Sequence, residues 1–420
     1  MKKLLILGGF PQMIDIVMTA RKMGVYTIVA DKEKSSPSKR FADKAVDIST
    51  DCLDDLEKLC CEEGVDGVFT GFEDFNIHIA CELCRRLNLP FYATREQLEM
   101  VTNKIRFKDT CRVYGVPVIE QYTFAEAVLE GKYPYIIKPA DSYGSRGITI
   151  CRNAKELESG YEKALTSSRS RTAIIERFVD SDHGTELFYT VINGHIHLTV
   201  TADRYTVRNG ETTVPLPVAE VFPSRHRDEM VEKIDKKIRK MLEGIGIQNG
   251  LVLIQALYSE SENAGEYFIY EMAYRLTGEQ HYRMVEKQHG VSLGQMMIEL
   301  ALGEDISGYD NAFLDDLSFV KPSINLAVVL NSGRIEKISG LEKVYQIDEV
   351  ISYNLTHADK DVIQASGDYS HMLIRVNMVA ENFSNLRRAV SEVAEYVTVV
   401  SDKGEDMLSD RFALSEEYGA

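Results

Sequence analysis

A short stretch that begins at Ile136 carries residue types that bind phosphate. It reads Ile-Ile-Lys-Pro-Ala-Asp-Ser-Tyr-Gly-Ser-Arg-Gly-Ile, a β-branched run followed by a turn of small residues. Glycines let backbone N–H groups approach an anion closely, hydroxyls add donors, and a lysine supplies positive charge. The residues that would cover a nucleoside triphosphate in this way are Lys138, Ser142, Gly144, Ser145 and Gly147. The alternative is an ordinary hairpin with a surface lysine, and the sequence contains no G-x-x-x-x-G-K-[ST] loop.

A second chemical signal lies in a predicted hairpin further along the chain. Strands expected over Leu251–Leu257 and Tyr267–Met272 flank a polar turn that contains Asn263. If the hairpin is symmetric about Asn263, Gln255 and Glu271 are opposite each other, because each lies eight residues from the centre. Opposite residues share one face, with Cβ atoms about 5 Å apart. Two such oxygen ligands suit Mg²⁺, which usually takes one or two from protein and the rest from phosphate and water.

The run Lys-Pro-Ala-Asp-x-x-Gly-Ser-x-Gly resembles the central motif of the ATP-grasp superfamily. The branch that it resembles contains the L-amino-acid ligases, and single ATP-grasp cores of carbamoyl-phosphate synthetases are also similar. The resemblance implies that the chain binds ATP together with Mg²⁺, or with Mn²⁺ in its place. It extends over about three quarters of the chain, because further motifs follow in the order of the family.

By the same resemblance, residues outside the opening stretch would hold the nucleotide. Lys104, in an Asn103-Lys104 pair before a helix expected to run to Tyr114, matches a phosphate-binding lysine. Glu176 matches the acceptor of the adenine amino group, and Glu186 matches a glutamate that binds ribose hydroxyls. Backbone edges at Arg177, Phe178 and Val179 would complete adenine recognition, and Leu257 would form the floor of the adenine pocket. The plainer alternatives are solvated surface for the lysine, strand-edge solubility for the glutamates and simple strand core for Leu257.

The resemblance also gives Gln255 and Glu271 the role of metal ligands, and it makes Arg275 the catalytic residue that stabilises charge on the reacting phosphoryl group. Family members usually show Glu-x-Asn-x-Arg at this place. This chain reads Glu-Met-Ala-Tyr-Arg from Glu271 to Arg275, with Ala273 at the asparagine position. A glutamine at the first ligand position is also found in the carbamoyl-phosphate synthetases. The number of metal ions therefore stays open.

The first ninety residues alternate between strand and helix patterns. Strands are expected at Lys3–Leu7, Tyr26–Ala30 and Val68–Thr70, with helices to Met23, over 51–63 and over 74–87. Pro11 is expected at the first position of the first helix. The alternation predicts a parallel, doubly wound sheet. A dinucleotide site is an alternative, although the turn after the first strand lacks the spacing G-x-G-x-x-G.

These patterns predict an α/β and α+β protein with the ATP-grasp fold. We expect an N-terminal doubly wound α/β domain over 1–92 and an ATP-grasp core with an antiparallel central sheet over 93–320. A small lid subdomain would occupy residues 116–184 of the core. The remaining residues, 321–420, would form an α+β module that caps the substrate site or makes an oligomer contact, so a homodimer is considered.

The charge balance excludes some partners. The 420 residues include 48 Lys and Arg and 65 Asp and Glu, which gives a net charge of −17. This balance argues against a nucleic-acid or anionic-membrane surface. The sequence contains no apolar run of about 18 residues, and its opening apolar segment is too short for a secretion signal. The expectation is a cytoplasmic enzyme.

The seven cysteines lie between Cys52 and Cys151, in one third of the chain. This distribution is not that of a secreted disulfide framework, and reduced thiols are the simpler interpretation. Cys81 and Cys84 have C-x-x-C spacing, but no second Cys/His pair completes a zinc site of that type.

The function that follows is that of an ATP-dependent carboxylate–amine ligase. By resemblance, ATP phosphorylates a small carboxylate to an acyl phosphate, and an amine displaces the phosphate to form an amide. No cysteine or serine motif presents a protein nucleophile. Two alternatives remain open: an enzyme that phosphorylates bicarbonate or formate, and an ATP-binding regulatory module without turnover.

Overall fold

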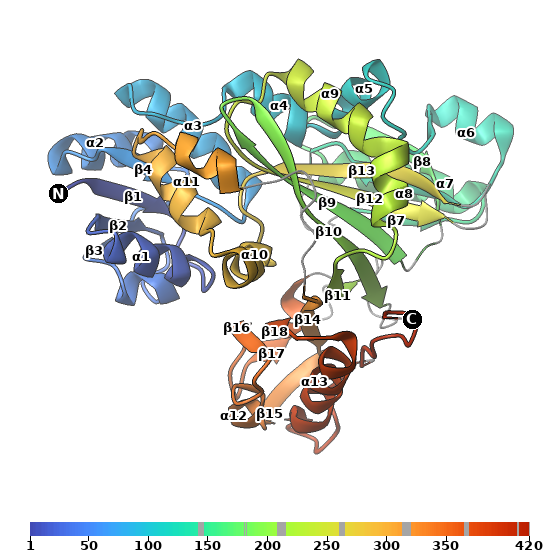
Figure 1. Ribbon diagram of the computed structural model, residues 1–420. Coiled ribbons are helices and arrows are strands. Elements are labelled where there is room, and N and C mark those ends of the chain that lie inside the picture. The colour runs from blue at the N-terminus through green and yellow to red at the C-terminus, as the bar shows by residue number, and fades with distance from the viewer. Residues whose placement is uncertain are drawn as a thin grey trace.

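The computed structural model describes residues 1–141, 147–179, 181, 183–207, 216–259, 265–312, 321–364, 369–409 and 411–419. Within these residues the strands form four sheets (Figure 1). No helix in the described ranges has the length and apolar character needed to cross a membrane. The predicted fold class is confirmed.

The N-terminal domain is a parallel sheet with the strand order β3-β2-β1-β4. Its strands are β1 (Lys3–Leu7), β2 (Tyr26–Ala30), β3 (Lys44–Val46) and β4 (Gly67–Phe69). Its helices are α1 (Met13–Lys22), α2 (Leu53–Glu63) and α3 (Asp74–Leu87). Buried aliphatic residues fill the space between sheet and helices, as the parallel alternation predicts. Strand β3 was not predicted. The prediction for Pro11 was wrong, because α1 begins two residues later and Pro11 lies in the preceding turn.

The lid is a small antiparallel sheet with the order β5-β8-β6-β7. Its strands are β5 (Gln121–Tyr122), β6 (Tyr135–Pro139), β7 (Thr149–Cys151) and β8 (Ala173–Arg177). Helices α6 (Phe124–Glu130) and α7 (Ala154–Ser167) belong to it. Two helices precede it, α4 (Arg95–Thr102) and α5 (Lys104–Val113). Thr94 and Gln97 form a capping box at α4, and Asn103 caps α5, so the predicted starts of both helices are confirmed.

An eight-stranded sheet forms the centre of the molecule, in the order β13-β12-β9-β10-β11-β14-β18-β16. Its strands are β9 (His183–Ile192), β10 (His195–Val207), β11 (Leu216–Phe222), β12 (Gly250–Ser259), β13 (Glu266–Tyr274), β14 (Ser323–Val329), β16 (Val350–Leu355) and β18 (Met372–Val379). All neighbours in this sheet are antiparallel. The last three strands come from beyond residue 320, so the C-terminal module extends the central sheet instead of standing apart.

The two faces of this sheet pack against different partners. Side chains alternate between the faces of a strand. On the front face, defined by Glu186 and Gln255, Phe188 and Leu253 join the hydrophobic core of the N-terminal domain. On the back face, defined by Leu187 and Ile254, the side chains pack with the helices that follow β11. These are α8 (Arg227–Met230), a π-turn at Val231–Asp235 and α9 (Lys236–Ile245).

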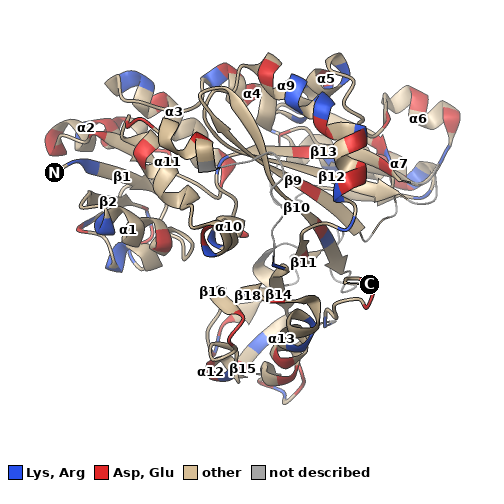
Figure 2. Ribbon diagram, in the orientation of Figure 1, with Lys and Arg blue, Asp and Glu red and all other residues tan. Residues whose placement is uncertain are grey.

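The remaining elements complete the front face and the C-terminal module. After β13 the chain crosses the front face and forms α10 (His281–His289), α11 (Leu293–Ala301) and a 3-10 turn at Ser307–Ala312. The module adds β15 (Gly333–Ser339), β17 (Val362–Ile363), β19 (Thr398–Ser401), α12 (Leu341–Val344) and α13 (Phe383–Tyr396). Two short 3-10 segments, Pro37–Arg40 and Tyr369–His371, lie elsewhere. Charged residues of both signs are spread over the helices (Figure 2).

Candidate functional site

Lys138 projects from β6 of the lid and is held by Glu176 on the neighbouring strand β8. The Lys138 ammonium lies 2.7 Å from Glu176 Oε2, and the Glu176 side chain is fully buried. Burial, with the charge of Lys104 adding to the effect, lowers the pKa of Lys138 to about 8. A phosphate beside this lysine would add to Glu176 in favouring the charged ammonium, as a phosphate-binding position requires.

Glu176 has a second partner that the sequence reading missed. Lys108, a buried residue of α5, donates to the other oxygen of the Glu176 carboxylate. Two lysines therefore share one glutamate, and the pair links α5 to the lid sheet. The four-residue spacing of Lys104 and Lys108 puts both on one face of the helix, and this spacing could have indicated that Lys108 also faces the site. Whether Glu176 also receives the adenine amino group stays a prediction.

Lys104 lies at the start of α5 and points toward the same lid strand. Its ammonium is 3.4 Å from the carbonyl oxygen of Pro139, at the end of β6. Burial lowers its pKa, while the carboxylates of Glu271 and Asp141 oppose that change. The structure therefore brings Lys104 and Lys138 together near the predicted metal ligand Glu271.

The glycine-rich turn is described only in part. Ser142, Gly144 and Ser145 lie outside the described residues. Gly147 is described and has φ of +78°, and a Cβ there would lie 2.7 Å from both Pro139 Cγ and Ser167 Cβ. No other residue fits that position without moving its neighbours.

The segment that leaves β8 passes close to Leu257. The Arg177 guanidinium lies over the ring of Phe268, at 5.1 Å from its centroid, and Phe268 is the cross-strand partner of Leu257. Leu257 is half-buried and shares the front face with Gln255. The N–H of Phe178 donates to the carbonyl of Pro134, and the carbonyl of Val179 accepts from Ser181. The predicted adenine-contacting residues thus lie near one another, and their contact with a base stays a prediction.

The predicted pairing of the β12–β13 hairpin is confirmed. Gln255 and Glu271 are direct cross-strand partners. Asn263, the proposed centre of the turn, lies outside the described residues. A β-bulge follows Gln255, so the pairs nearer the turn, such as Ser259 with Glu266, have a register shifted by one residue. The bulge was not predictable from a symmetric hairpin.

Glu271 has an exposed carboxylate next to several charged groups. The residue is exposed as a whole, but the surrounding protein removes part of the water around its carboxylate and so raises its pKa; the charge of Asp74 adds to the rise, while Lys104 and Arg275 oppose it. A divalent cation bound to this carboxylate would keep it ionised. The side-chain nitrogen of Gln255 donates to Glu186 Oε1 at 2.7 Å, which leaves the amide oxygen of Gln255 available as a ligand.

Glu186 lies beside the metal pair. It is the cross-strand partner of Gln255, and Arg204 Nε is 3.5 Å from its Oε1. Burial raises the pKa of Glu186 to about 7. Its other oxygen, Oε2, is buried and has no hydrogen-bond partner among the described residues. The predicted binding of ribose hydroxyls by Glu186 stays untested. Its neighbours, Gln255 and Arg204, are residue types that also suit a metal ion or a charged substrate.

A row of polar side chains continues from Glu186 across the front face. Arg204, Glu220, Asn325, Asn377 and Ser352 are successive cross-strand partners in β10, β11, β14, β18 and β16. We call these residues, together with Glu186 and Arg375, the front row. Asn325 donates to the carbonyl of Glu279 at 2.8 Å, so the segment after β13 lies over the row.

Arg375 brings the C-terminal module into the site. Its guanidinium lies 3.9 Å from Glu220 and 3.8 Å from Glu279, and it donates to the side chain of Asn325. Its Nη2 and the Oε2 of Glu220 are buried without a hydrogen-bond partner in the described part of the chain. The sequence reading found no functional residue here. The signal was weak, because Arg375 and Asn377 are the two polar residues of a strand that is otherwise apolar.

Arg275, the predicted catalytic residue, directly follows β13 and is hydrogen-bonded to the N-terminal domain. Its Nε donates to Asp74 Oδ1 at 2.6 Å, and Asp74 is the first residue of α3. The carboxylates of Asp74, Glu279 and Glu271 raise its pKa against the effect of burial. Arg275 therefore stays charged, and its approach to a reacting phosphoryl group stays a prediction.

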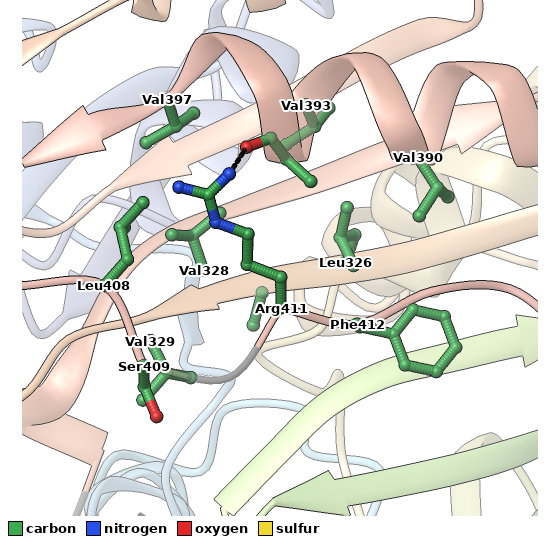
Figure 3. A pocket seen from close by; sticks show the side chains of 12 residues that line it. Leu326, Val328, Val329, Val390, Val393, Val397, Leu408, Ser409, Arg411 and Phe412 are labelled. Atoms are coloured by element: carbon green, nitrogen blue, oxygen red, sulfur yellow. Dashed lines mark hydrogen bonds between the residues drawn. The ribbon is translucent and has the colours of Figure 1, made fainter.

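A pocket in the C-terminal module has a different character (Figure 3). It lies between α13 and β14 and is lined mainly by aliphatic side chains, with Leu326, Val393 and Leu408 among them. Its one cation, Arg411, donates to the carbonyl of Ala394 at 2.5 Å. The described residues that line this pocket include no carboxylate that could bind a metal ion, so we place the candidate site on the front face of the central sheet.

Comparison with known proteins agrees with the geometry. Residues 99–308, half of the 420-residue chain, match the family described as carbamoyl-phosphate synthase L chain, ATP binding domain. A formate-dependent phosphoribosylglycinamide formyltransferase of Sulfurisphaera tokodaii is 26% identical over 233 residues, which are 53% of this chain and 55% of that relative. The match therefore spans about half the length of that protein. The 2-oxoglutarate carboxylase small subunit of Hydrogenobacter thermophilus is 24% identical over 72% of this chain and 67% of its own.

Among solved structures, the L-amino acid ligase from Bacillus licheniformis has a TM-score of 0.77. The superposition covers 96% of this chain and 99% of that chain, at 19% sequence identity. An identity this low shows a shared fold and leaves the reaction open.

Proposed function

Because the chain belongs to the ATP-grasp superfamily, we propose that it is an ADP-forming ligase that activates a small carboxylate as an acyl phosphate and joins it to an amine. Membership of the family supports the use of ATP, and the charges of the front row are our basis for proposing an amine as the second substrate. We expect the enzyme to act on small molecules in the cytoplasm. A homodimer stays a prediction that light scattering can test.

The residues present fit a magnesium ion. Glu271 offers an exposed carboxylate and Gln255 an amide oxygen on the same face, which match the oxygen ligands that Mg²⁺ prefers. Ala273 has no ligand atom, so the two side chains would hold one ion and share it with phosphate and water. The ion would supply positive charge beside the phosphates.

The chain's own cations would do the remaining electrostatic work. Lys104 and Lys138 would bind phosphate oxygens from the lid side, and Glu176 would keep Lys138 in place. Arg275 would meet the charge that develops as the phosphoryl group moves to the carboxylate. Asp74 fixes the orientation of Arg275, so this charge is present before the substrate arrives.

The observation that favours an amine substrate is a surplus of carboxylates in the front row. Glu186 and Glu220 of the row and Glu279 beside it face the guanidinium groups of Arg204 and Arg375, three carboxylates against two cations. Arg275 is also near Glu279, but it is already paired with Asp74. Burial raises the pKa of Glu186 and of Glu220, and the charge of the neighbouring carboxylates adds to the rise. A substrate ammonium would compensate that charge, whereas bicarbonate or formate would add a negative charge.

Hydroxylamine trapping tests this proposal. Given ATP, Mg²⁺ and a panel of amino acids and other small carboxylates, the enzyme is expected to form a hydroxamate, because hydroxylamine attacks an acyl phosphate. The natural amine is expected to suppress trapping by competing for the same carbonyl. ADP release that depends on bicarbonate or formate, with no hydroxamate from the panel, would assign the one-carbon reaction instead.

A third result would argue against any catalytic activity. Tight ATP binding with no ADP release on any carboxylate, amine or one-carbon acid would favour the regulatory module. Arg275→Ala sharpens the assay, because ATP binding is expected to survive while hydroxamate formation falls by about 100-fold or more.

A further inference from the structure

Three potential metal ligands meet on the back face of the central sheet. They are His183 at the start of β9, Asp203 in β10 and His226 in the turn before α8. Within the described chain, they are the one set of three or more His, Cys, Asp or Glu side chains whose ligand atoms all lie within 4.8 Å of one another. His183 Nε2 and Asp203 Oδ1 are 3.6 Å apart.

Two buried ring nitrogens of this cluster make no hydrogen bond within the described chain, although His183 Nε2 faces Asp203 Oδ1 at 3.6 Å. Neither His183 Nε2 nor His226 Nε2 has a hydrogen-bond partner among the described residues. Burying an imidazole nitrogen without a partner costs free energy, so such groups call for a ligand. The two side chains as a whole are 13% and 14% exposed, which leaves a route by which an ion can enter.

Surrounding groups orient all three side chains. Asp203 accepts from the Ser224 hydroxyl at 2.5 Å, the Arg225 backbone N–H at 3.0 Å and the Tyr418 hydroxyl at 2.6 Å. The His183 ring is stacked on Tyr205 with an interplanar angle of 8°. Such partners hold ligands in place in metal sites.

His226 and the nearby cation are also fixed. The ring of His226 packs against Tyr258 with ring centroids 4.2 Å apart, and its Nδ1 lies 3.8 Å from Glu229 Oε2, beyond hydrogen-bonding distance. The Arg225 guanidinium, which would repel a cation, pairs with Glu417. The local charge therefore permits a divalent ion.

We propose that His183, Asp203 and His226 form a zinc site on the back face of the sheet. A tetrahedral Zn²⁺ with bonds near 2.1 Å separates its ligand atoms by about 3.4 Å, close to the spacing already present between His183 and Asp203. Two imidazoles favour zinc over Mg²⁺, which prefers oxygen ligands. The fourth position would hold water.

The site is separate from the ATP site. In β10, Asp203 pairs with Thr185 on the back face and Arg204 pairs with Gly184 on the front face. The ion would join β9, β10 and the turn before α8, and through Asp203 it would also fix Tyr418 near the C-terminal end of the described chain. The role is structural and does not rest on the proposed reaction.

The chain contains a matched control cluster. His195, His197 and Asp310 have the same residue types, but the two imidazoles already bond separate oxygens of Asp310, at 2.8 and 2.7 Å.

Two exposed thiols, Cys52 and Cys61, could bind zinc non-specifically, so every variant is made in a Cys52→Ser/Cys61→Ser background. The full chain is stripped with a chelator, reloaded with Zn²⁺ and freed of excess metal. Zinc per chain is measured by mass spectrometry, and its affinity by competition with a chromophoric chelator.

We expect about one zinc per chain, and we expect His183→Asn and His226→Asn each to weaken zinc binding by at least about tenfold. The His195→Asn/His197→Asn control and the front-face variant Glu271→Gln are expected to bind zinc as the parent does. Zinc is also expected to raise the Tm of the parent and not that of the back-face variants. A parent that holds no zinc at micromolar free metal, or back-face variants that bind like the parent, would overturn the proposal.

Co²⁺ provides a second test that needs no variant. If His183→Asn and His226→Asn fail to fold, the parent loaded with Co²⁺ is expected to show the visible absorption of a four- or five-coordinate ion without a thiolate charge-transfer band. A parent that takes up no Co²⁺ in that geometry, or that shows thiolate ligation, would refute the site.

Discussion

The front and back faces of the central sheet carry ionisable groups of different kinds, although the same strands supply both. The front face has carboxylates and guanidiniums in cross-strand register, several with buried atoms that have no hydrogen-bond partner among the residues that the structure describes. The back face has two imidazoles and one carboxylate, with Asp203 hydrogen-bonded on both oxygens. The front face thus suits anions, ammonium groups and Mg²⁺, and the back face suits a softer ion that stays in place.

The comparison teaches how closely two chemistries can be interleaved. Asp203 and Arg204 are adjacent in sequence, yet the alternation of side chains sends one to the zinc cluster and the other to the front row. A slip of one residue in β10 would exchange them. If the two faces are independent, front-face variants change the reaction and retain zinc.

Lys138→Ala is expected to have the largest effect. The variant removes a partly buried cation from the proposed phosphate site, so kcat/KM should fall by about 100- to 1,000-fold and ATP affinity should weaken. Lys132→Ala is the matched control, because Lys132 is a surface lysine of the lid that pairs with Glu130. ATP affinity is measured by calorimetry, and the zinc content of each variant is measured in parallel. Unchanged ATP binding in folded Lys138→Ala protein would remove the opening stretch from the site.

Glu271→Gln is expected to shift the magnesium requirement. The variant keeps the size of the side chain and removes the one carboxylate of the metal pair, so half-maximal ADP release should need about 10- to 100-fold more Mg²⁺. Glu266→Gln, at the start of the same strand, is the control. Metal-free nucleotide binding should change little. An unaltered magnesium titration would show that the hairpin pair does not bind the ion.

The titration of Glu186 should make stability depend on pH. Its folded pKa is raised from 4.5 to about 7 by burial, so the folded state holds the proton more tightly than the unfolded state. The stabilisation is therefore present in acid and lost as the pH rises toward 7 and above. Between pH 5.5 and 7.5 this group should remove about 2 kcal/mol from the free energy of unfolding. Urea unfolding of Glu186→Gln should lack that part of the pH dependence. An identical dependence in both proteins would mean that Glu186 ionises normally.

Arg375→Lys should produce the smallest of these effects. Lysine keeps the charge and loses the planar fork, so the KM of the non-nucleotide substrate should rise by about tenfold while the KM of ATP stays within about twofold. Arg388→Lys controls for a surface arginine of the same module, where Arg388 pairs with Glu349 and Glu392. A rise in the KM of ATP alone would show that Arg375 acts on the nucleotide, and it would contradict the proposal that the front row binds the other substrate.

The local patterns made much of the fold predictable. Helix starts at Thr94 and Asn103 follow from capping chemistry, and the Gln255–Glu271 pairing follows from counting outward from a polar turn. Such features depend on residues close together in sequence. The predicted domain boundaries stay untested, although β14 and β18 show that residues after 320 continue the central sheet.

What sequence reasoning missed depends on contacts over long distances. Arg375 meets Glu220 across β14, and Lys108 meets Glu176 across 68 residues of chain. The back-face histidines are 43 residues apart, and their spacing matches no short zinc motif. Only the order of strands in the sheet shows that these groups are neighbours.

The junction between β11 and β14 has a consequence for any shortened form of the chain. Ala219 to Phe222 of β11 pair with Leu326 to Ser323 of β14. A protein ending before β14 would keep every predicted ATP-binding residue but would present β11 as an open edge of unpaired N–H and C=O groups. Open edges recruit strands from other molecules. By covering the edge of β11, the last hundred residues therefore also prevent self-association through that strand.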